Sequence, residues 1–169
     1  MPVPEYVTRM REHIGHDLLL LPGAGAVVRD EQGWILLLRR SDNGRWSLPA
    51  GMIEPGEQPA EAILREVAEE TGVIAEIESL AGVATHQTEY PNGDKCCFLA
   101  VWFRCRAVGG APRPDGDESL EVGFFAPDAL PPLGEFAELR IRTTAEAGAP
   151  AWFAAPGETY DAFGPAHGL

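Results

Sequence analysis

The segment at residues 51–73 constrains this chain more than any other part, because it predicts a loop followed by one helix with two different sides. A Pro-Gly pair within it marks a turn. Pro59 suits the first position of a helix, where its missing N–H costs nothing. Gly72 suits the end of a helix, where a left-handed backbone conformation is favoured. We therefore predict a helix over residues 59–71.

The predicted helix has an apolar side and an acidic side. Its apolar side is a stripe at helical spacing, formed by Ala60, Ile63, Leu64, Val67, Ala68 and Thr71. Glu66, Glu69 and Glu70 follow at i, i+3 and i+4, so they share the other face. Such a group repels itself unless a cation lies between its members, and Mg²⁺ or Mn²⁺ prefers oxygen ligands of this kind. A solvated acidic surface is the alternative for these residues alone.

The whole segment resembles the Nudix box, G-x5-E-x7-R-E-U-x-E-E-x-G-U, where U is aliphatic. Every fixed position of that pattern is matched, by Gly51, Glu57, Arg65, Glu66, Val67, Glu69, Glu70, Gly72 and Val73. The resemblance extends over about residues 22–146. It implies an α+β Nudix fold, in which a mixed β-sheet is sandwiched between helices in three layers (α/β/α).

The resemblance also implies an activity. Members of this family are hydrolases that cleave the diphosphate linkage of a nucleoside diphosphate joined to another moiety, by attack of water at phosphorus. Nucleoside triphosphates, ADP-ribose, dinucleoside polyphosphates and nucleotide sugars are all open as substrates. The alternative is a regulatory protein of the same fold that binds a nucleotide without catalysis. Such proteins usually have a degenerate box, whereas this box is intact.

The resemblance assigns roles to residues of the box and its border. It implies that the ligands of a Mg²⁺ or Mn²⁺ cofactor are the carboxylates of Glu66, Glu69 and Glu70, with the backbone carbonyl of Ala50. It implies that Arg65 and Glu57 pair and orient the helix. The family more often has glycine where this chain has Ala50, and a carbonyl ligand survives that change.

The general base is expected outside the helix, in the acidic loop at residues 115–121. Relatives place such a glutamate on a loop before the last strand. Glu118 is the first choice for the general base and Glu121 the second. A box glutamate serves as the base in some relatives, and an ordinary solvated loop is the alternative for this segment.

Residues that contact the substrate are less constrained. Arg39 and Arg40 end a predicted strand, so their side chains point to opposite faces and one of them is a candidate for binding phosphate. Tyr90 lies as far past the box as a tyrosine found in some dinucleoside polyphosphate hydrolases. Pro91 lies slightly too far for the proline of ADP-ribose hydrolases. Both residues also fit a hairpin turn.

His86 and Trp46 are two further candidates for the site. His86 is expected to be a hydrogen-bonded histidine of a strand rather than a catalytic group. Trp46 could stack on a base, but packing in the core or a loop explains it as well.

The composition limits the partners. The 169 residues carry a net charge of −13, which disfavours long nucleic acid and anionic membranes but leaves a small nucleotide open where metal ions screen the site. The apolar run at 18–21 is too short to span a bilayer. Three cysteines, Cys96, Cys97 and Cys105, share one apolar stretch, which fits free thiols and a cytoplasmic location.

The chain divides into three predicted parts. Residues 1–21 form an arm whose helix, at 4–14, has an apolar stripe that needs a partner, either in its own domain or in a homodimer. Residues 22–147 form the catalytic domain, and residues 148–169 form a tail rich in Ala, Gly and Pro. The strands expected in the domain have the ranges 25–29, 34–40, 74–80, 82–88, 96–108 and 121–126. The strand at 96–108 is expected to be central and buried on both faces.

Overall fold

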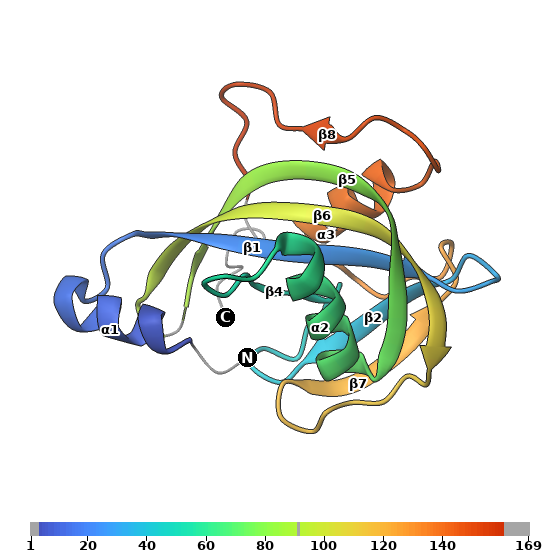
Figure 1. Cartoon of the computed structure of the whole chain (residues 1–169), viewed down its shortest axis with the longest axis horizontal. Helices are drawn as coiled ribbons and strands as arrows, with labels where there is room; N and C mark the ends of the chain where they lie inside the picture. The colour runs from blue at the N-terminus through green and yellow to red at the C-terminus, as the bar shows by residue number, and fades with distance from the viewer. Residues whose placement is uncertain (1–3, 91, 161–169) are drawn as a thin grey trace.

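In the computed structural model, residues 4–90 and 92–160 are described, and they form one mixed β-sheet with helices on both faces (Figure 1). Pro91 lies outside the described residues, so its predicted role is not placed. In chain order the elements are α1 (Glu5–Ile14), β1 (Leu19–Arg29), β2 (Ile35–Arg40), β3 (Trp46–Ser47), β4 (Ala50–Met52), α2 (Pro59–Thr71), β5 (Val73–Glu89), β6 (Lys95–Gly110), β7 (Ser119–Phe125), α3 (Glu135–Thr143) and β8 (Trp152–Phe153).

The sheet has the strand order β3-β2-β1-β6-β5-β8, with β4 paired to β1 and β7 paired to β2. Strands β1 and β6 run parallel, as do β5 and β8, while the remaining pairs are antiparallel. Because side chains alternate along a strand, β1 sends Ala26 to the core under α2 and Val27 to the core under α3. On β6, Phe103 and Trp102 divide in the same way. The predicted three-layer Nudix fold is confirmed.

Strand β5 differs from the prediction of two strands. It is one strand of 17 residues that keeps its pairing with β6 through register shifts at Ile77/Ser79 and Leu80/Gly82. A Cβ on Gly82 would lie 2.2 Å from the ring of Trp102. Gly82 therefore makes room for the indole rather than ending the strand.

Strand β1 begins earlier than predicted and runs through Pro22. The carbonyl of Pro22 accepts a hydrogen bond from the N–H of Ile53, on the side of β4. The missing N–H of the proline points to that same side, where the pairing of β1 with β4 comes to its end at Met52. The ladder to β6 on the other side therefore loses no hydrogen bond.

Strand β6 is central, but the prediction that it is buried on both faces is wrong at its ends. Trp102 and Phe103 are buried on opposite faces in its middle. Leu99 and Val108 are 46% and 41% exposed. The reason is that α2 and α3 are shorter than the strand and cover only its middle part.

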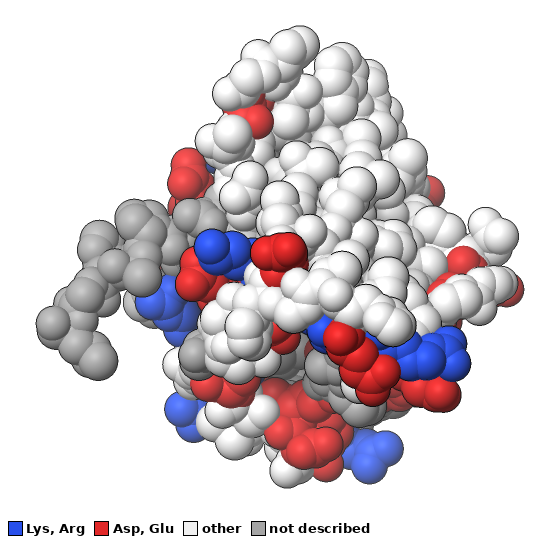
Figure 2. Space-filling view, turned by 90° about the vertical axis from the view of Figure 1, so that its left-hand side faces the viewer, with Lys and Arg blue, Asp and Glu red and all other residues white. Residues whose placement is uncertain are grey.

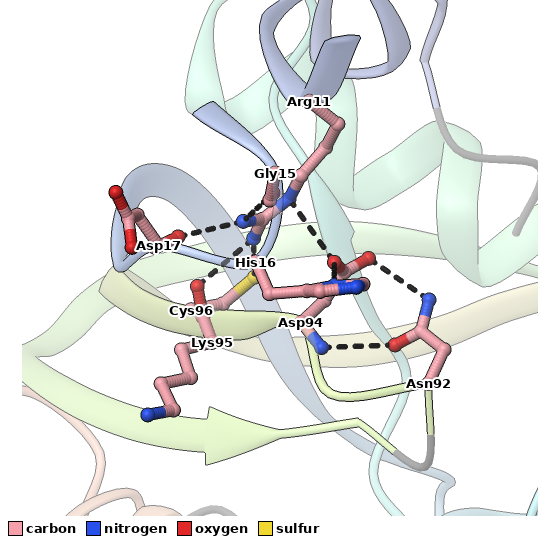
Figure 3. A network of polar contacts seen from close by, with 8 residues as sticks. All are labelled: Arg11, Gly15, His16, Asp17, Asn92, Asp94, Lys95 and Cys96. Atoms are coloured by element: carbon pink, nitrogen blue, oxygen red, sulfur yellow. Dashed lines mark hydrogen bonds and ion pairs between the residues drawn. The ribbon is translucent and has the colours of Figure 1, made fainter. Parts of the chain in front are cut away.

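Helix α1 packs on its own domain. Val7 is buried beside Leu21 of β1 and Cys96 of β6, which gives the apolar stripe an intramolecular partner. The guanidinium of Arg11 donates to the backbone carbonyls of Gly15, Asp17 and Lys95 and to Sγ of Cys96, and lies 3.7 Å from the carboxylate of Asp94 (Figure 3). The homodimer stays a prediction.

The described part of the tail lies along the sheet edge. Strand β8 pairs with β5, and the ring of Trp152 lies 5.7 Å from that of Trp102. Further along, the carbonyl of Tyr160 accepts a hydrogen bond from the N–H of Gln87. Phe153, the other residue of β8, is 71% exposed, so Trp152 and not Phe153 anchors this strand.

The helices are short. The longest of those described, α2, has 13 residues, and none has the length and apolar character needed to cross a membrane.

Candidate active site

Helix α2 forms over Pro59–Thr71, as the sequence predicts. Its start is fixed by a capping box, in which the side chain of Glu61 accepts a hydrogen bond from the N–H of Gln58 and the Gln58 side chain caps the first turn in return. Its end is fixed by Gly72, which has a φ of 70°. Both ends of the helix that carries the glutamates are therefore held by local sequence.

The end of α2 is also held by the loop that follows β6. A Cβ on Gly72 would lie 2.6 Å from the side chain of Arg113 and 2.8 Å from the carbonyl of Ala111. The N–H of Arg113 donates to the carbonyl of Thr71 at 2.9 Å. The close approach of this loop to the helix end thus depends on a glycine.

Two polar residues fix the second half of that loop. One carboxylate oxygen of Asp115 accepts hydrogen bonds from three successive N–H groups, those of residues 117–119. The hydroxyl of Ser119, which is fully buried, donates to the carbonyl of Glu70 at 2.8 Å. These contacts bring Glu118, the first choice for the general base, to the end of α2 that carries Glu70.

Arg65 links three carboxylates into one network. Its Nε and Nη2 donate to both oxygens of Glu57, at 2.9 and 3.0 Å. Its Nη1 donates to Glu66 at 2.8 Å and to Glu69 at 3.2 Å. Glu66 is only 2% exposed, so this contact supplies the positive charge that a buried carboxylate requires. The side chain of Glu69 is 62% exposed.

Glu70 is the carboxylate without such compensation. It is 6% exposed, and its Oε2 has no hydrogen-bond partner. Burial, and then the charge of Glu66, raise the pKa of Glu70 to about 8, against the opposing effects of the Arg40 charge and a backbone hydrogen bond from Ala50. A buried carboxyl oxygen with no partner and a raised pKa fits a site for a cation.

The backbone of Ala50 faces the same place. In β4, Gly51 is paired with Ala24 of β1, and the carbonyl of Pro49 accepts from the N–H of Ala26. Since bonding directions alternate along a strand, the N–H and the carbonyl of Ala50 both point away from β1. The hydrogen bond from Ala50 to the Glu70 carboxylate agrees with this direction. The carbonyl that the resemblance implies as a metal ligand is therefore on the side of the glutamates.

These carboxylates surround a cavity of about 220 Å³, which we call the acidic cavity. It is lined by Glu54, Arg65, Glu66, Glu69, Glu70, Asp115 and Glu118. Within residues 4–90 and 92–160, no three acidic, histidine or cysteine side chains already form a group that could hold an ion. Because Arg65 engages Glu66 and Glu69, further oxygen ligands from substrate and water would be needed. On the face drawn in Figure 2, most of the charged side chains gather in the lower half and the upper half carries only a few.

A second cavity of about 310 Å³, which we call the deep pocket, meets the acidic cavity. Glu70 and Glu118 line both. From there the deep pocket extends over the sheet toward α3. A ligand with a highly charged part and a less polar part could occupy the two cavities at once.

The structure separates the candidates for substrate binding. Arg40 and Tyr90 line the deep pocket. Nε and Nη2 of Arg40 donate to the two carboxylate oxygens of Asp42, at 2.9 and 2.7 Å. Arg39 pairs instead with Glu121 at 2.5 Å, and neither of these two is among the described residues that line either cavity. Arg40 and Glu118, rather than Arg39 and Glu121, are brought to the site.

The structure gives Trp46 and His86 different surroundings. The ring of Trp46 packs edge-on against Phe125, at 4.9 Å between centroids, so it belongs to the core and not to the pocket. His86 lines the deep pocket and stacks on Phe98 at 5.3 Å. Burial, and then the charge of Arg140, lower the pKa of His86 to about 4, so its ring is neutral at pH 7.

The sequence reasoning missed Arg140, a buried arginine of α3 that lines the deep pocket. A signal for it exists. With Phe136 and Leu139 it completes an i, i+3, i+4 stripe, which is the buried side of α3. A charged residue on such a stripe is a candidate for function.

Comparison with known proteins places this geometry in a family. The family model described as NUDIX domain matches residues 19–147. A MutT-like protein of Streptomyces ambofaciens is 38% identical over 125 residues, which cover 74% of this chain and 75% of that protein. An ADP-ribose pyrophosphatase of Methanocaldococcus jannaschii is 36% identical over 112 residues, covering 64% of this chain and 63% of that protein.

A solved structure agrees. The crystal structure of a MutT NUDIX hydrolase from Burkholderia pseudomallei superposes with a TM-score of 0.63 at 31% identity, over 74% of this chain and 98% of that one. The chain belongs to the Nudix family, and the enzyme class predicted from its sequence, a Nudix pyrophosphohydrolase, is confirmed.

Proposed function

We propose that this protein is a Mg²⁺- or Mn²⁺-dependent hydrolase that cleaves the diphosphate linkage of a nucleoside diphosphate joined to another moiety. The substrates considered are nucleoside triphosphates, ADP-ribose, dinucleoside polyphosphates and nucleotide sugars. The observation that carries the proposal is the junction of the two cavities at Glu70 and Glu118. It lets the phosphates of a nucleotide lie among the glutamates while the nucleoside lies in the deep pocket.

The glutamates of α2 have the task of concentrating positive charge where the diphosphate lies. Glu66, Glu69 and Glu70, with the carbonyl of Ala50, would hold the divalent ion, and the partnerless oxygen of Glu70 supports this. When bound, such an ion neutralises phosphate oxygens and acidifies a coordinated water. Burial raises the pKa of Glu66, and the hydrogen bond and charge of Arg65 oppose that effect in favour of the ionised form.

Glu118 is proposed as the general base that takes the proton of the attacking water. It lines both cavities, and the hydrogen bonds to Asp115 and Ser119 fix the loop on either side of it. Arg40, which lines the deep pocket with Glu70 and Glu118, would contact the phosphate that faces away from the glutamates. Its pairing with Asp42 holds its guanidinium in one orientation.

The test is a panel assay with Mg²⁺ or Mn²⁺ that detects released phosphate with and without added phosphatase. The panel contains nucleoside triphosphates, ADP-ribose, dinucleoside polyphosphates and nucleotide sugars. We expect turnover of one class of substrate, and none after addition of a chelator. Nucleotide binding without turnover of any member would instead favour a regulatory protein that has kept the fold but not the activity.

A further inference from the structure

Arg140 is a buried cation without a counter-ion. It is 8% exposed, its Nε has no hydrogen-bond partner, and none of the described carboxylates pairs with it. Its guanidinium lies 5.1 Å from the centre of the Phe136 ring. Among the described residues, this cation–π contact is the one that stabilises its charge. Burial lowers the pKa of Arg140 to about 10, so the group is charged at pH 7. Such a group is costly unless a ligand completes it.

The chain makes room for this guanidinium in the wall of the deep pocket. A Cβ on Gly25 would lie 2.5 Å from Nη1 of Arg140. Gly25 and Arg140 both line the pocket, as do Gly23 and Ala100, which are register partners on β1 and β6. Three positions with no side chain beyond Cβ form a flat floor beside the guanidinium.

Aromatic rings border that floor. His86, Phe98 and Phe136 line the pocket, and the His86 ring lies 5.3 Å from that of Phe98 and 4.6 Å from that of Phe136. The neutral ring of His86 does not repel the charge of Arg140. Its Nδ1 is buried and, like Nε of Arg140, has no partner. A flat floor with ring walls fits a planar heterocycle rather than a tetrahedral phosphate.

We propose that the deep pocket selects a guanine base, and that Arg140 recognises it through two hydrogen bonds donated to O6 and N7. A guanidinium has only donors, in a planar fork. Guanine presents two adjacent acceptors on this edge, whereas adenine presents one acceptor and one donor. The inference rests on the proposed function, because it names the nucleotide whose phosphates would lie among the glutamates.

The test measures binding rather than turnover. Isothermal titration calorimetry of the full chain in Mg²⁺ compares GMP, AMP and 7-deaza-GMP, which have no P–O–P linkage to cleave. We expect GMP to bind about tenfold more tightly than AMP, which is within the discrimination of a good bidentate contact. Because 7-deaza-GMP lacks the N7 acceptor, its affinity should fall to that of AMP.

Two variants of α3 assign the preference to Arg140. Arg140→Met should lower the affinity for GMP about tenfold and that for AMP less than threefold. Arg142→Met removes the same charge from an exposed position of the same helix and should leave both affinities within about twofold. The melting temperature of Arg140→Met should not fall, since a buried charge without a partner is removed. A structural arginine would instead give a lower melting temperature and an unchanged preference.

Equal affinities for GMP and AMP in the wild type would overturn the inference, as would an Arg140→Met variant that retains the preference for GMP. The panel assay on the same preparation separates the two proposals. Turnover without any preference for guanine overturns only the base selectivity. A preference for GMP in a protein that hydrolyses nothing overturns only the proposed hydrolysis.

Discussion

The acidic cavity and the deep pocket leave polar groups of opposite kind without a partner, although they share two lining residues. In the acidic cavity the atom without a partner is Oε2 of the buried Glu70. In the deep pocket Nε of the buried Arg140 has none, and neither has Nδ1 of His86. The first requires a cation and the second requires an acceptor, so neither site is complete in the protein alone. The comparison indicates one ligand that brings metal-bound phosphates to one end and a base with acceptors to the other.

Replacing Glu70 tests the acidic side of the comparison and has the largest expected effect. We expect Glu70→Gln to lower kcat by about 10³-fold or more, because several kcal/mol of charge stabilisation by the ion are lost. The variant should melt no lower than the wild type, since it no longer repels Glu66. Glu12→Gln, at an exposed position of α1, is the control for loss of one negative charge. Turnover close to wild type in Glu70→Gln would remove this residue from the site.

A matched pair of variants on one loop and strand tests the general base. We expect Glu118→Gln to lower kcat by about 10²-fold, the typical effect of general-base catalysis. Glu121→Gln should stay within a few-fold, because Glu121 pairs with Arg39 away from both cavities. Steady-state rates at saturating substrate decide between them. The reverse ranking would make Glu121 the base.

The deep pocket can be altered without touching its arginine. We expect Gly25→Ala to reduce GMP affinity about tenfold with little change for AMP, because the new Cβ displaces the guanidinium that makes a specific contact. Gly23→Ala, on the same strand, adds a Cβ to the floor with its nearest neighbours at 3.5 Å, so it should change the affinities for GMP and AMP alike. Calorimetry with both nucleotides measures the difference. Equal effects of the two substitutions would contradict the role given to Gly25.

The contacts of α1 drawn in Figure 3 should affect the stability of the fold more than catalysis or binding in either cavity. The hydrogen bond from His16 lowers the pKa of Asp94, despite slight burial, and Asn92 and Arg11 add to this. A lowered pKa stabilises the fold above the ordinary value of 3.8 and loses that effect as the pH falls through the lower, folded-state value. We expect Asp94→Asn to lower the melting temperature by about 2 °C at pH 7.

This difference between Asp94→Asn and the wild type should shrink as the pH falls below 3.8, as measured by urea unfolding at several pH values. The kcat of the variant should remain within about twofold, because Asp94 lines neither cavity in the described structure. A difference in stability that is constant down to low pH would show that the carboxylate charge is not the cause.

The two cavities also differ in how far the sequence predicts them. The helix limits, the glutamate face and the pairing partners of Arg65 follow from local rules of capping, turn formation and helical spacing, together with the matched box. Glu118 could be proposed because the loop lies at a fixed place in the family. Local rules do not predict that this loop is attached to α2 through Ser119, because the attachment depends on contacts between distant segments.

The deep pocket is formed by residues that no single segment brings together. Gly25, His86 and Arg140 come from β1, β5 and α3, and only the sheet order places them side by side. For the same reason the sequence predicted two strands where β5 is one, because Trp102, the ring that requires Gly82, is on the neighbouring strand. The spacing of Arg140 on the buried stripe of α3 was the one local signal.

A crystal structure would show most directly whether one nucleotide joins the acidic cavity and the deep pocket. The complex would contain the wild-type protein, Mn²⁺ and a guanosine triphosphate analogue with a methylene group in place of the α,β-bridging oxygen. We expect an anomalous Mn²⁺ peak at Glu70 and the guanine edge within hydrogen-bonding distance of Arg140. A nucleotide that binds with its base outside the deep pocket, or a metal ion that does not contact Glu70, would contradict this expectation.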